Sequence, residues 1–246
     1  MNLPGFFQNE PNIHSVKYKR SIDEQLVDKL IYYIQSACKK STKVIVEINS
    51  GINSLAAGVL FKKALGEKAI AIIVDLDAAK TNNLANICQN LGFNTYILKR
   101  STAYQNELAA YHLTKQEDIR RFYKRFINYH LLTAADHMKA ELTDTACKSD
   151  RLATLRPEGF YGHFAPFYCL YKTEVYDLAK LLGISYEYSE EDKYFTKIDP
   201  ILYLLEHQKT PEEISQEFKI DLQWLKKLKS HIDKQSFETP VSQFII

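Results

Sequence analysis

The first half of the chain alternates short apolar runs with longer segments in which apolar residues recur every three or four positions. The short runs are rich in β-branched residues, as buried strands are, and the longer segments have the period of amphipathic helices. Strands are predicted over 43–48, 69–74 and 94–98, and helices over 22–38, 53–65 and 80–91. This alternation favours right-handed βαβ units, and therefore a Rossmann-like parallel α/β sheet with helices on both faces.

The second half is mostly helical in pattern. Helical spacing and start or stop signals predict helices over 117–130, 172–182, 211–218 and 221–231. No internal repeat and no long linker divides the chain, so we expect one domain over residues 1–246 with a helical C-terminal part.

Composition and charge exclude several classes of protein. The 32 Lys and Arg residues nearly balance the 30 Asp and Glu residues, so the net charge of +2 gives no bulk attraction to nucleic acid or anionic lipid. The longest apolar stretch, residues 69–74, is far below the roughly 20 residues that span a bilayer. The four cysteines lie far apart without a Cys-x-x-Cys motif, which is typical of reduced thiols. We therefore expect a cytoplasmic protein that spans no membrane and has no general affinity for nucleic acid.

The loop after the first predicted strand is the first candidate site. It contains Asn49, Ser50, Gly51, Asn53 and Ser54. Parallel sheets bind ligands at the carboxyl ends of their strands, and the N–H groups at a helix start bind anions. The same residues also suit an ordinary capped turn, because Ser and Asn are common helix caps.

A second candidate is Lys172-Thr173, at the start of a predicted helix. A lysine and a threonine there can place an ammonium and a hydroxyl beside phosphate oxygens. Alternatively, the pair forms a solvated first turn.

Together, the order and context of the two candidates resemble the NAD synthetase family, of the adenine-nucleotide-hydrolase-like group. Family members carry Ser-Gly-Gly-x-Asp-Ser after the first strand, and later Ala-Pro-x-x-x-Leu-Tyr-Lys-Thr-x-Val followed by Leu-Ala and Leu-Gly. Residues 165–184 read Ala-Pro-Phe-Tyr-Cys-Leu-Tyr-Lys-Thr-Glu-Val-Tyr-Asp-Leu-Ala-Lys-Leu-Leu-Gly-Ile. Residues 195–199, Phe-Thr-Lys-Ile-Asp, also look like the family's C-terminal region.

The resemblance implies an activity and its cofactors. In the family, the carboxylate of deamido-NAD attacks the α-phosphate of ATP, and ammonia then displaces AMP to form NAD. By resemblance, residues 49–54 would hold pyrophosphate, while Lys172 would supply catalytic charge and Thr173 would contact ATP phosphates. A loop Asp and a distant Glu hold Mg²⁺ in the family, and a homodimer is implied. Such a site acts by charge stabilisation.

The sequence departs from the family pattern in the phosphate loop, the metal site and the lid, where only residues 185–197 separate Leu-Gly-Ile from Ile-Asp. Asn49 and Ser50 stand where the family has Ser and Gly, and Asn53 stands for the metal-binding Asp. Asn is a weaker magnesium ligand than a carboxylate. Glu141 is the candidate for the metal-binding Glu, although it also suits an exposed helix acid.

Three interpretations follow. The chain is either an ammonia-dependent NAD synthetase or a noncatalytic paralogue that binds a nucleotide or a partner protein. A third interpretation makes residues 211–218 and 221–231 a helix-turn-helix for DNA. The near-neutral charge disfavours it, and Trp224, Leu225 and Leu228 instead indicate a packing stripe.

Overall fold

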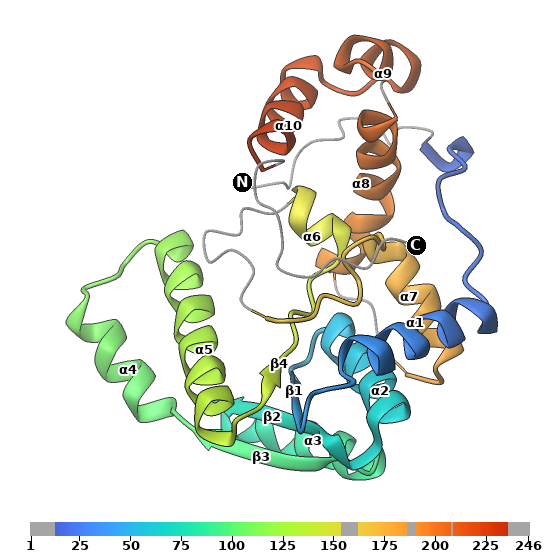
Figure 1. The fold of residues 1–246 in the computed structure, drawn as a ribbon. Helices are drawn as coiled ribbons and strands as arrows, with labels where there is room; N and C mark the ends of the chain where they lie inside the picture. Colours follow the sequence, from blue (N-terminus) through green and yellow to red (C-terminus); the bar gives the residue numbers. More distant parts are fainter. Residues whose placement is uncertain (1–12, 154–161, 186–189, 208, 236–246) are drawn as a thin grey trace.

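A four-stranded parallel sheet forms the centre of the computed structural model, which describes residues 13–153, 162–185, 190–207 and 209–235 (Figure 1). The strands lie in the order β3-β2-β1-β4. Their bounds are β1 Val44–Glu47, β2 Ala69–Asp75, β3 Asn94–Lys99 and β4 Glu141–Leu142. The three predicted strands and their parallel pairing are confirmed. The two-residue β4 was not predicted, because its pattern is too short to distinguish from a loop.

The described ranges contain ten α-helices. Their bounds are α1 Glu24–Ala37, α2 Ile52–Leu65, α3 Ala78–Asn90, α4 Ser101–Ala110, α5 Gln116–Met138, α6 Lys148–Ala153, α7 Lys172–Leu181, α8 Glu190–Glu206, α9 Pro211–Phe218 and α10 Leu222–Gln235. The seven predicted helices are confirmed, with α5 extending eight residues beyond its predicted end. Helices α4, α6 and α8 were not predicted.

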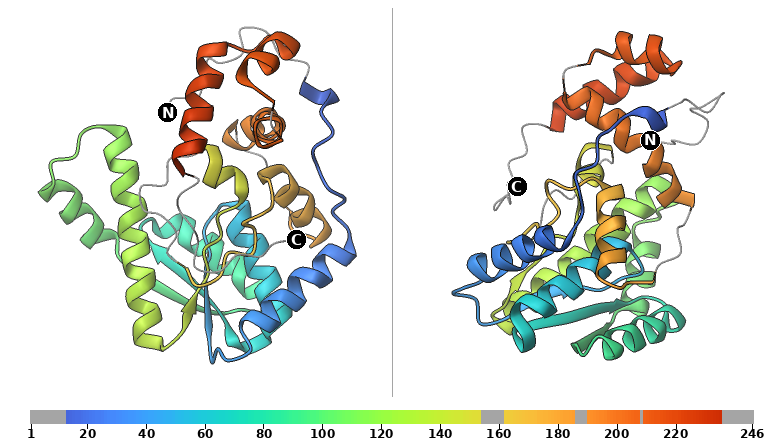
Figure 2. Two further views of the ribbon diagram at one scale, coloured as in Figure 1. Left: turned by 45° about the horizontal axis from the view of Figure 1, so that its top comes forward. Right: turned by 90° about the vertical axis from the view of Figure 1, so that its right-hand side faces the viewer.

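The two faces of the sheet are covered by different helices. Successive strand residues point to opposite faces, so Val44 and Val46 pack with α1, α2 and α7, whereas Ile45 packs with α5. Figures 1 and 2 show α5 on one side of the sheet and α1 and α2 on the other. We call the core on the side of α1 and α2 the sheet cluster; it includes buried apolar residues of α1, α2, α7, β1 and β2, and also Cys147.

The order of the strands reverses next to β1. The chain steps from β1 to β2 and β3 and then returns to the opposite side of β1 to form β4. At such a switch point, the connections that follow the two neighbouring strands lead away from each other and leave a crevice for ligands. Here the connections lead into α2 and α6, so the residues at the starts of these two helices meet at the carboxyl edge of the sheet.

A separate helical cluster lies in the upper part of Figure 1. It consists of the buried apolar residues of α6, α8, α9 and α10, together with Ile13, Tyr171 and Ile220. Trp224, Leu225 and Leu228 of α10 are buried in it, which confirms the packing stripe expected from the sequence. Among the described helices, none has the length and apolar character that crossing a membrane requires.

Residues 162–164 run beside the end of β4. The His163 N–H donates to the carbonyl of Leu142 at 2.6 Å, and the Asp144 N–H donates to the carbonyl of Phe164 at 2.7 Å. A Cβ atom on Gly162 would lie only 2.3 Å from the backbone nitrogen of Asp144. Only glycine permits this close backbone approach, which fixes the segment that leads from β4 toward α6.

We expect Gly162→Ala to lower the free energy of unfolding by about 2–3 kcal/mol, because two backbone segments must move apart. Urea denaturation measures the change. Gly183→Asn is the control, since Gly183 has open space and a left-handed φ of +76° that Asn tolerates. Equal unfolding midpoints for the Gly162→Ala variant and the unmodified protein would contradict the prediction.

Candidate functional site

Three polar side chains from three different helices meet at the carboxyl edge of the sheet. Lys172, at the start of α7, donates from Nζ to Asn53 Oδ1 at 3.0 Å and lies 3.4 Å from Asp150 Oδ1. Asn53, in the first turn of α2, donates from Nδ2 to Asp150 Oδ2 at 2.7 Å. We call these residues the Asn53–Asp150–Lys172 cluster; it joins the loops that follow β1 and β4 at the switch point.

The amide of Asn53 is well matched to its surroundings. Its Nδ2 also donates to the backbone carbonyl of Thr145 at 2.9 Å, while its oxygen accepts from Lys172. A carboxylate here would put an oxygen against both the Thr145 carbonyl and the Asp150 carboxylate, with no proton to share. The neutral amide is therefore the group that satisfies all three neighbours.

Asp150 is a site residue that the sequence reasoning missed. Besides Asn53, its Oδ2 accepts from the Cys147 N–H and from Cys147 Sγ, both at 3.1 Å. Burial raises the pKa of the Cys147 thiol, which therefore stays protonated and donates. The signal available in the sequence was Lys148-Ser149-Asp150, a polar helix start following a strand, but the strand itself was not recognised.

The loop after β1 forms a closed turn. The Gly51 N–H donates to Asn49 Oδ1 at 2.8 Å, and the Asn49 N–H donates to Ser54 Oγ at 3.0 Å. The Ser54 hydroxyl in turn donates to the backbone carbonyl of Asn49 or Gly51, and Ser50 is exposed at the tip. The structure thus brings the predicted loop residues together, with the Asn49 side-chain oxygen on the Gly51 N–H.

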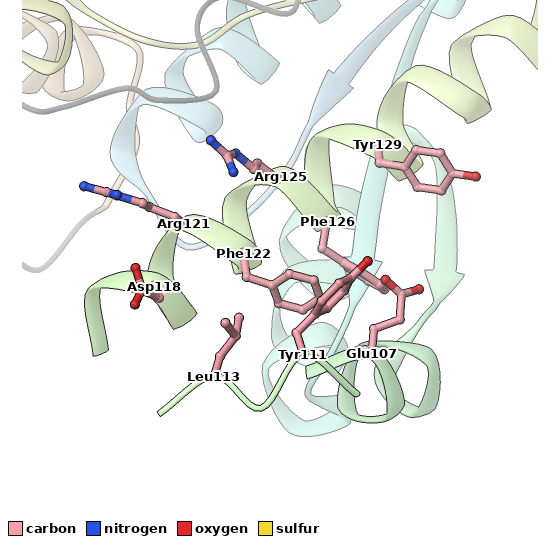
Figure 3. Close-up of a pocket in the computed structure, with 9 residues that line it drawn as sticks. All are labelled: Glu107, Tyr111, Leu113, Asp118, Arg121, Phe122, Arg125, Phe126 and Tyr129. Carbon is pink, nitrogen blue, oxygen red and sulfur yellow. The ribbon is translucent and has the colours of Figure 1, made fainter. Parts of the chain in front are cut away.

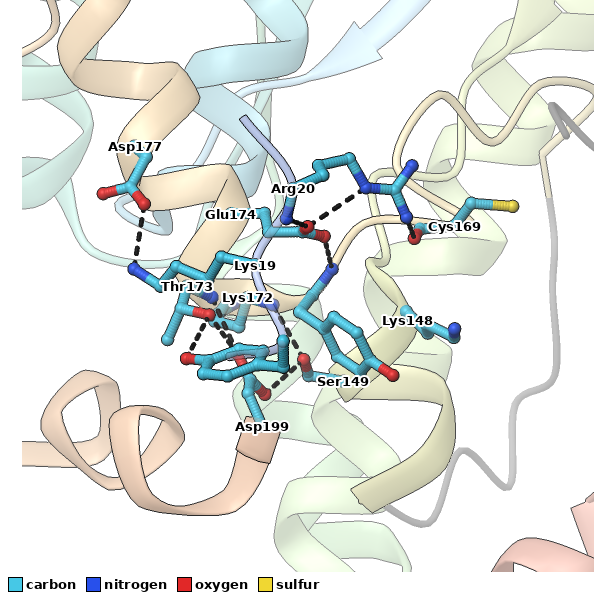
Figure 4. A network of polar contacts seen from close by, with 12 residues as sticks. Lys19, Arg20, Lys148, Ser149, Cys169, Lys172, Thr173, Glu174, Asp177 and Asp199 are labelled. Atoms are coloured by element: carbon cyan, nitrogen blue, oxygen red, sulfur yellow. Dashed lines mark hydrogen bonds and ion pairs between the residues drawn. The ribbon is translucent and has the colours of Figure 1, made fainter. Parts of the chain in front are cut away.

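Thr173 lies in a buried network rather than at the surface of the site (Figure 4). Its hydroxyl donates to Asp199 Oδ2 at 2.8 Å and accepts from the Tyr18 hydroxyl at 3.0 Å. The Thr173 side chain is therefore engaged within the protein, and its contacts do not favour the predicted contact with ATP phosphates. Lys172, by contrast, keeps its ammonium at the site and places it 5.4 Å from the centre of the Phe195 ring.

Two buried carboxylates hold the start of α7. Asp199 accepts from the Thr173 N–H at 2.8 Å, and Glu174 accepts from the Tyr171 N–H at 2.8 Å and from Arg20 Nε at 3.0 Å. Burial raises the pKa of Asp199 to about 6, although hydrogen bonds from Ser149 and Thr173 oppose this increase. At neutral pH, Asp199 is therefore mostly ionised and accepts these hydrogen bonds as a carboxylate.

Glu141 is placed away from the cluster. It is the first residue of β4 and pairs with Val44, the first residue of β1, whereas the loop of residues 49–54 follows the end of that strand. Its carboxylate contacts the Ser41 hydroxyl. The structure thus does not bring Glu141 to Asn53, because the register sets it at the amino edge of the sheet. The carboxylate beside Asn53 is Asp150.

A resident magnesium ion does not fit the described side chains. Within the described ranges, no group of three His, Cys, Asp or Glu residues is placed to hold a metal ion. At the site, Asp150 is the carboxylate beside Asn53, and its Oδ2 already accepts from Asn53 and Cys147. The amide nitrogen of Asn53 faces that carboxylate, so it supplies a donor where a metal ligand would need an oxygen.

A concave surface lies between α4 and α5 (Figure 3). It has a volume of about 500 Å³ and is lined by Glu107, Tyr111, Leu113, Asp118, Arg121, Phe122, Arg125, Phe126 and Tyr129. Aromatic rings form its floor, and Arg121 and Arg125 project from successive turns of α5. It belongs to a different part of the molecule from the Asn53–Asp150–Lys172 cluster.

Comparison with known protein sequences finds relatives named NH(3)-dependent NAD(+) synthetase. A relative from Methanocaldococcus jannaschii, named NH(3)-dependent NAD(+) synthetase, is 28% identical over 244 residues, covering 81% of this chain and 88% of its own. A relative of the same name from Campylobacter jejuni is 27% identical over 221 residues, covering 86% of each chain.

Solved structures of similar proteins confirm the fold. An NH3-dependent NAD synthetase from Campylobacter jejuni superposes with a TM-score of 0.72 at 22% identity, covering 92% of this chain and all of that one. An NMN synthetase from Francisella tularensis gives 0.68 at 14% identity, covering 92% and 99%. The expected adenine-nucleotide-hydrolase type of fold is therefore correct.

The family model described as NAD synthase matches residues 22–241, a range that includes the whole Asn53–Asp150–Lys172 cluster. The chain therefore belongs to the NAD synthase family.

Proposed function

We propose that this protein is an ammonia-dependent NAD synthetase, which uses ATP to convert the carboxylate of deamido-NAD into the amide of NAD. The observation that carries the proposal is the Lys172 ammonium, held by Asn53 and Asp150 at the carboxyl edge of the sheet. Its ammonium lies at the switch point, where nucleotides bind in open α/β sheets. The two relatives named NH(3)-dependent NAD(+) synthetase support the same reaction.

The reaction has two steps. A carboxylate oxygen of deamido-NAD attacks the α-phosphorus of ATP, and the bond to the bridging oxygen of pyrophosphate breaks, so pyrophosphate leaves with the electron pair. Ammonia then attacks the carbonyl carbon of the adenylate. AMP leaves, and the nitrogen loses a proton to give the neutral amide.

In this mechanism, Lys172 stabilises the negative charge that develops on the leaving pyrophosphate. It acts as a fixed cation and transfers no proton, and its contacts with Asn53 Oδ1 and the Asp150 carboxylate hold the ammonium in place. Its side chain is only 13% exposed, which leaves it less screened by water than a surface lysine. Asn53 and Asp150 thus orient the ammonium before the nucleotide arrives.

The loop after β1 completes the phosphate site by a local change. When a phosphate oxygen takes the Gly51 N–H, the Asn49 side-chain oxygen that now accepts from it must move aside. Ser54 keeps its hydrogen bond to the Asn49 backbone, so the turn itself keeps its shape. We propose that magnesium enters only as a complex with the phosphates of ATP, because the side chains that the structure describes do not build a metal site.

We further propose a cytoplasmic homodimer in which the α4–α5 face is the contact between copies. Large apolar side chains are exposed on these helices or between them: Tyr111, Tyr123, Tyr129 and Leu132. Tyr111 and Tyr129 also line the concave surface, and exposed side chains of this kind are typical of protein interfaces. The concave surface beside them would then lie next to the second copy.

Replacing Lys172 by Ala should lower kcat/KM for NAD formation by about 100-fold or more, because a preorganised positive charge is lost. The assay contains deamido-NAD, ATP, magnesium and ammonia. Lys180→Ala is the matched control, since Lys180 lies at the exposed end of the same helix. A folded wild-type protein that releases no AMP and forms no NAD would contradict the proposal and favour the noncatalytic paralogue.

Replacing Asn53 by Asp should make the stability of the protein depend on magnesium. The new carboxylate would face Asp150 and the Thr145 carbonyl, so we expect a loss of about 1–3 kcal/mol without metal. Millimolar magnesium should recover most of it by bridging the two carboxylates. Thermal unfolding with and without magnesium measures this, and an equal response of the unmodified protein would refute it.

A further inference from the structure

Two residues on one face of α8 lie near opposite ends of Lys172. Phe195 and Asp199 are four residues apart on this helix and therefore project from the same side. The Phe195 ring lies 5.4 Å from the Lys172 ammonium. Asp199 reaches the backbone at the other end of the residue, through Ser149 and through the N–H of Thr173.

From this arrangement we infer that Phe195 and Asp199 are positioning residues, which set the Lys172 ammonium at the phosphate site through the first turn of α7. The inference rests on the proposed function, because it assigns these two residues to the same reaction. Neither side chain is expected to touch the substrate.

Asp199 supplies the acceptors that the start of α7 lacks. The first N–H groups of a helix have no partners within the helix, and the N-cap residue Tyr171 has no short side-chain acceptor to offer. Asp199 Oδ2 accepts directly from the Thr173 N–H. Asp199 Oδ1 accepts from Ser149 Oγ at 2.6 Å. Ser149 Oγ in turn accepts from the Lys172 N–H at 2.7 Å.

The same carboxylate ties α6 to α7. Ser149, which donates to Asp199, directly precedes Asp150, the ion-pair partner of Lys172. Fixing Ser149 therefore fixes the spacing between Asp150 and Lys172. Asp199 has no exposed surface, so water is not in place to substitute for it when the carboxylate is removed. Figure 4 shows the carboxylate between Ser149 and Thr173.

Phe195 acts on the ammonium itself. An aromatic ring attracts a cation on its face but offers no oxygen or nitrogen acceptor. The Lys172 N–H groups are therefore directed to Asn53, Asp150 and an incoming phosphate, while the ring supports the remaining side. Leucine at this position would fill part of the space without attracting the charge.

Two variants and two matched controls test the inference. Asp199→Ala removes the acceptor from α7, and Thr210→Ala removes the equivalent side-chain cap from α9. Phe195→Leu removes the ring beside the Lys172 ammonium. Phe218→Leu removes a ring of α9 that lies beside the Lys209 ammonium. Both controls therefore lose the same type of interaction at α9.

Hydrogen exchange and ATP binding provide separate measurements. Amide exchange at Lys172 and Thr173 should become at least tenfold faster in Asp199→Ala, whereas Thr210→Ala should leave it unchanged. By calorimetry, the Kd for ATP should rise at least tenfold in Asp199→Ala and Phe195→Leu and less than threefold in the controls. Asp199→Asn, which keeps an acceptor for the Thr173 N–H, should restore most of the affinity.

The outcomes separate this inference from the proposed function. Failure of the unmodified protein to bind ATP would refute the proposed function, and exchange at residues 172 and 173 would still decide whether Asp199 holds α7. Unchanged exchange in Asp199→Ala would overturn the role of Asp199. If folded Asp199→Ala or Phe195→Leu protein loses no more affinity for ATP than its matched control, the positioning role of that residue is overturned.

Discussion

The requirement that the partly buried Lys172 ammonium be given partners shapes the region around it. A charge taken out of water is costly unless opposite charges or acceptors surround it. Here an amide oxygen comes from α2, a carboxylate comes from α6 and an aromatic face comes from α8. Meeting this one requirement fixes how three helices lie around the carboxyl edge of the sheet.

The amide at position 53 belongs to the same arrangement. In the sequence, Asn53 stands where the family pattern has a metal-binding Asp, and an amide is a weaker magnesium ligand than a carboxylate. In the structure, its two hydrogen-bonding ends are used in opposite senses, the oxygen toward Lys172 and the nitrogen toward Asp150. The departure from the family pattern is therefore compatible with an ordered site, and the loss of one carboxylate is offset by an amide that needs no cation between itself and Asp150.

The sequence predicted the elements with clear periodicity and missed those defined by distant contacts. The three longer strands and Lys172 could be predicted, because β-branched runs and a motif of consecutive residues are local signals. Asp150 could not, since β4 has only two residues and is held by pairing with β1, about 97 residues earlier in the chain. Glu141 resembles the metal-binding Glu of the family by sequence. Only the strand register shows that it lies at the amino edge of the sheet, away from Asn53. The network behind Thr173 was also hidden, because it joins Tyr18 to Asp199.

Asp150 and Lys172 both lie at points where the chain passes between the sheet cluster and the helical cluster. Asp150 lies between Cys147, which packs in the sheet cluster, and Leu152, which packs in the helical cluster. Lys172 likewise lies between Tyr171 of the helical cluster and Val175 of the sheet cluster. Both residues thus stand where the chain passes from one core to the other, so the distance between them depends on how the two cores pack against each other.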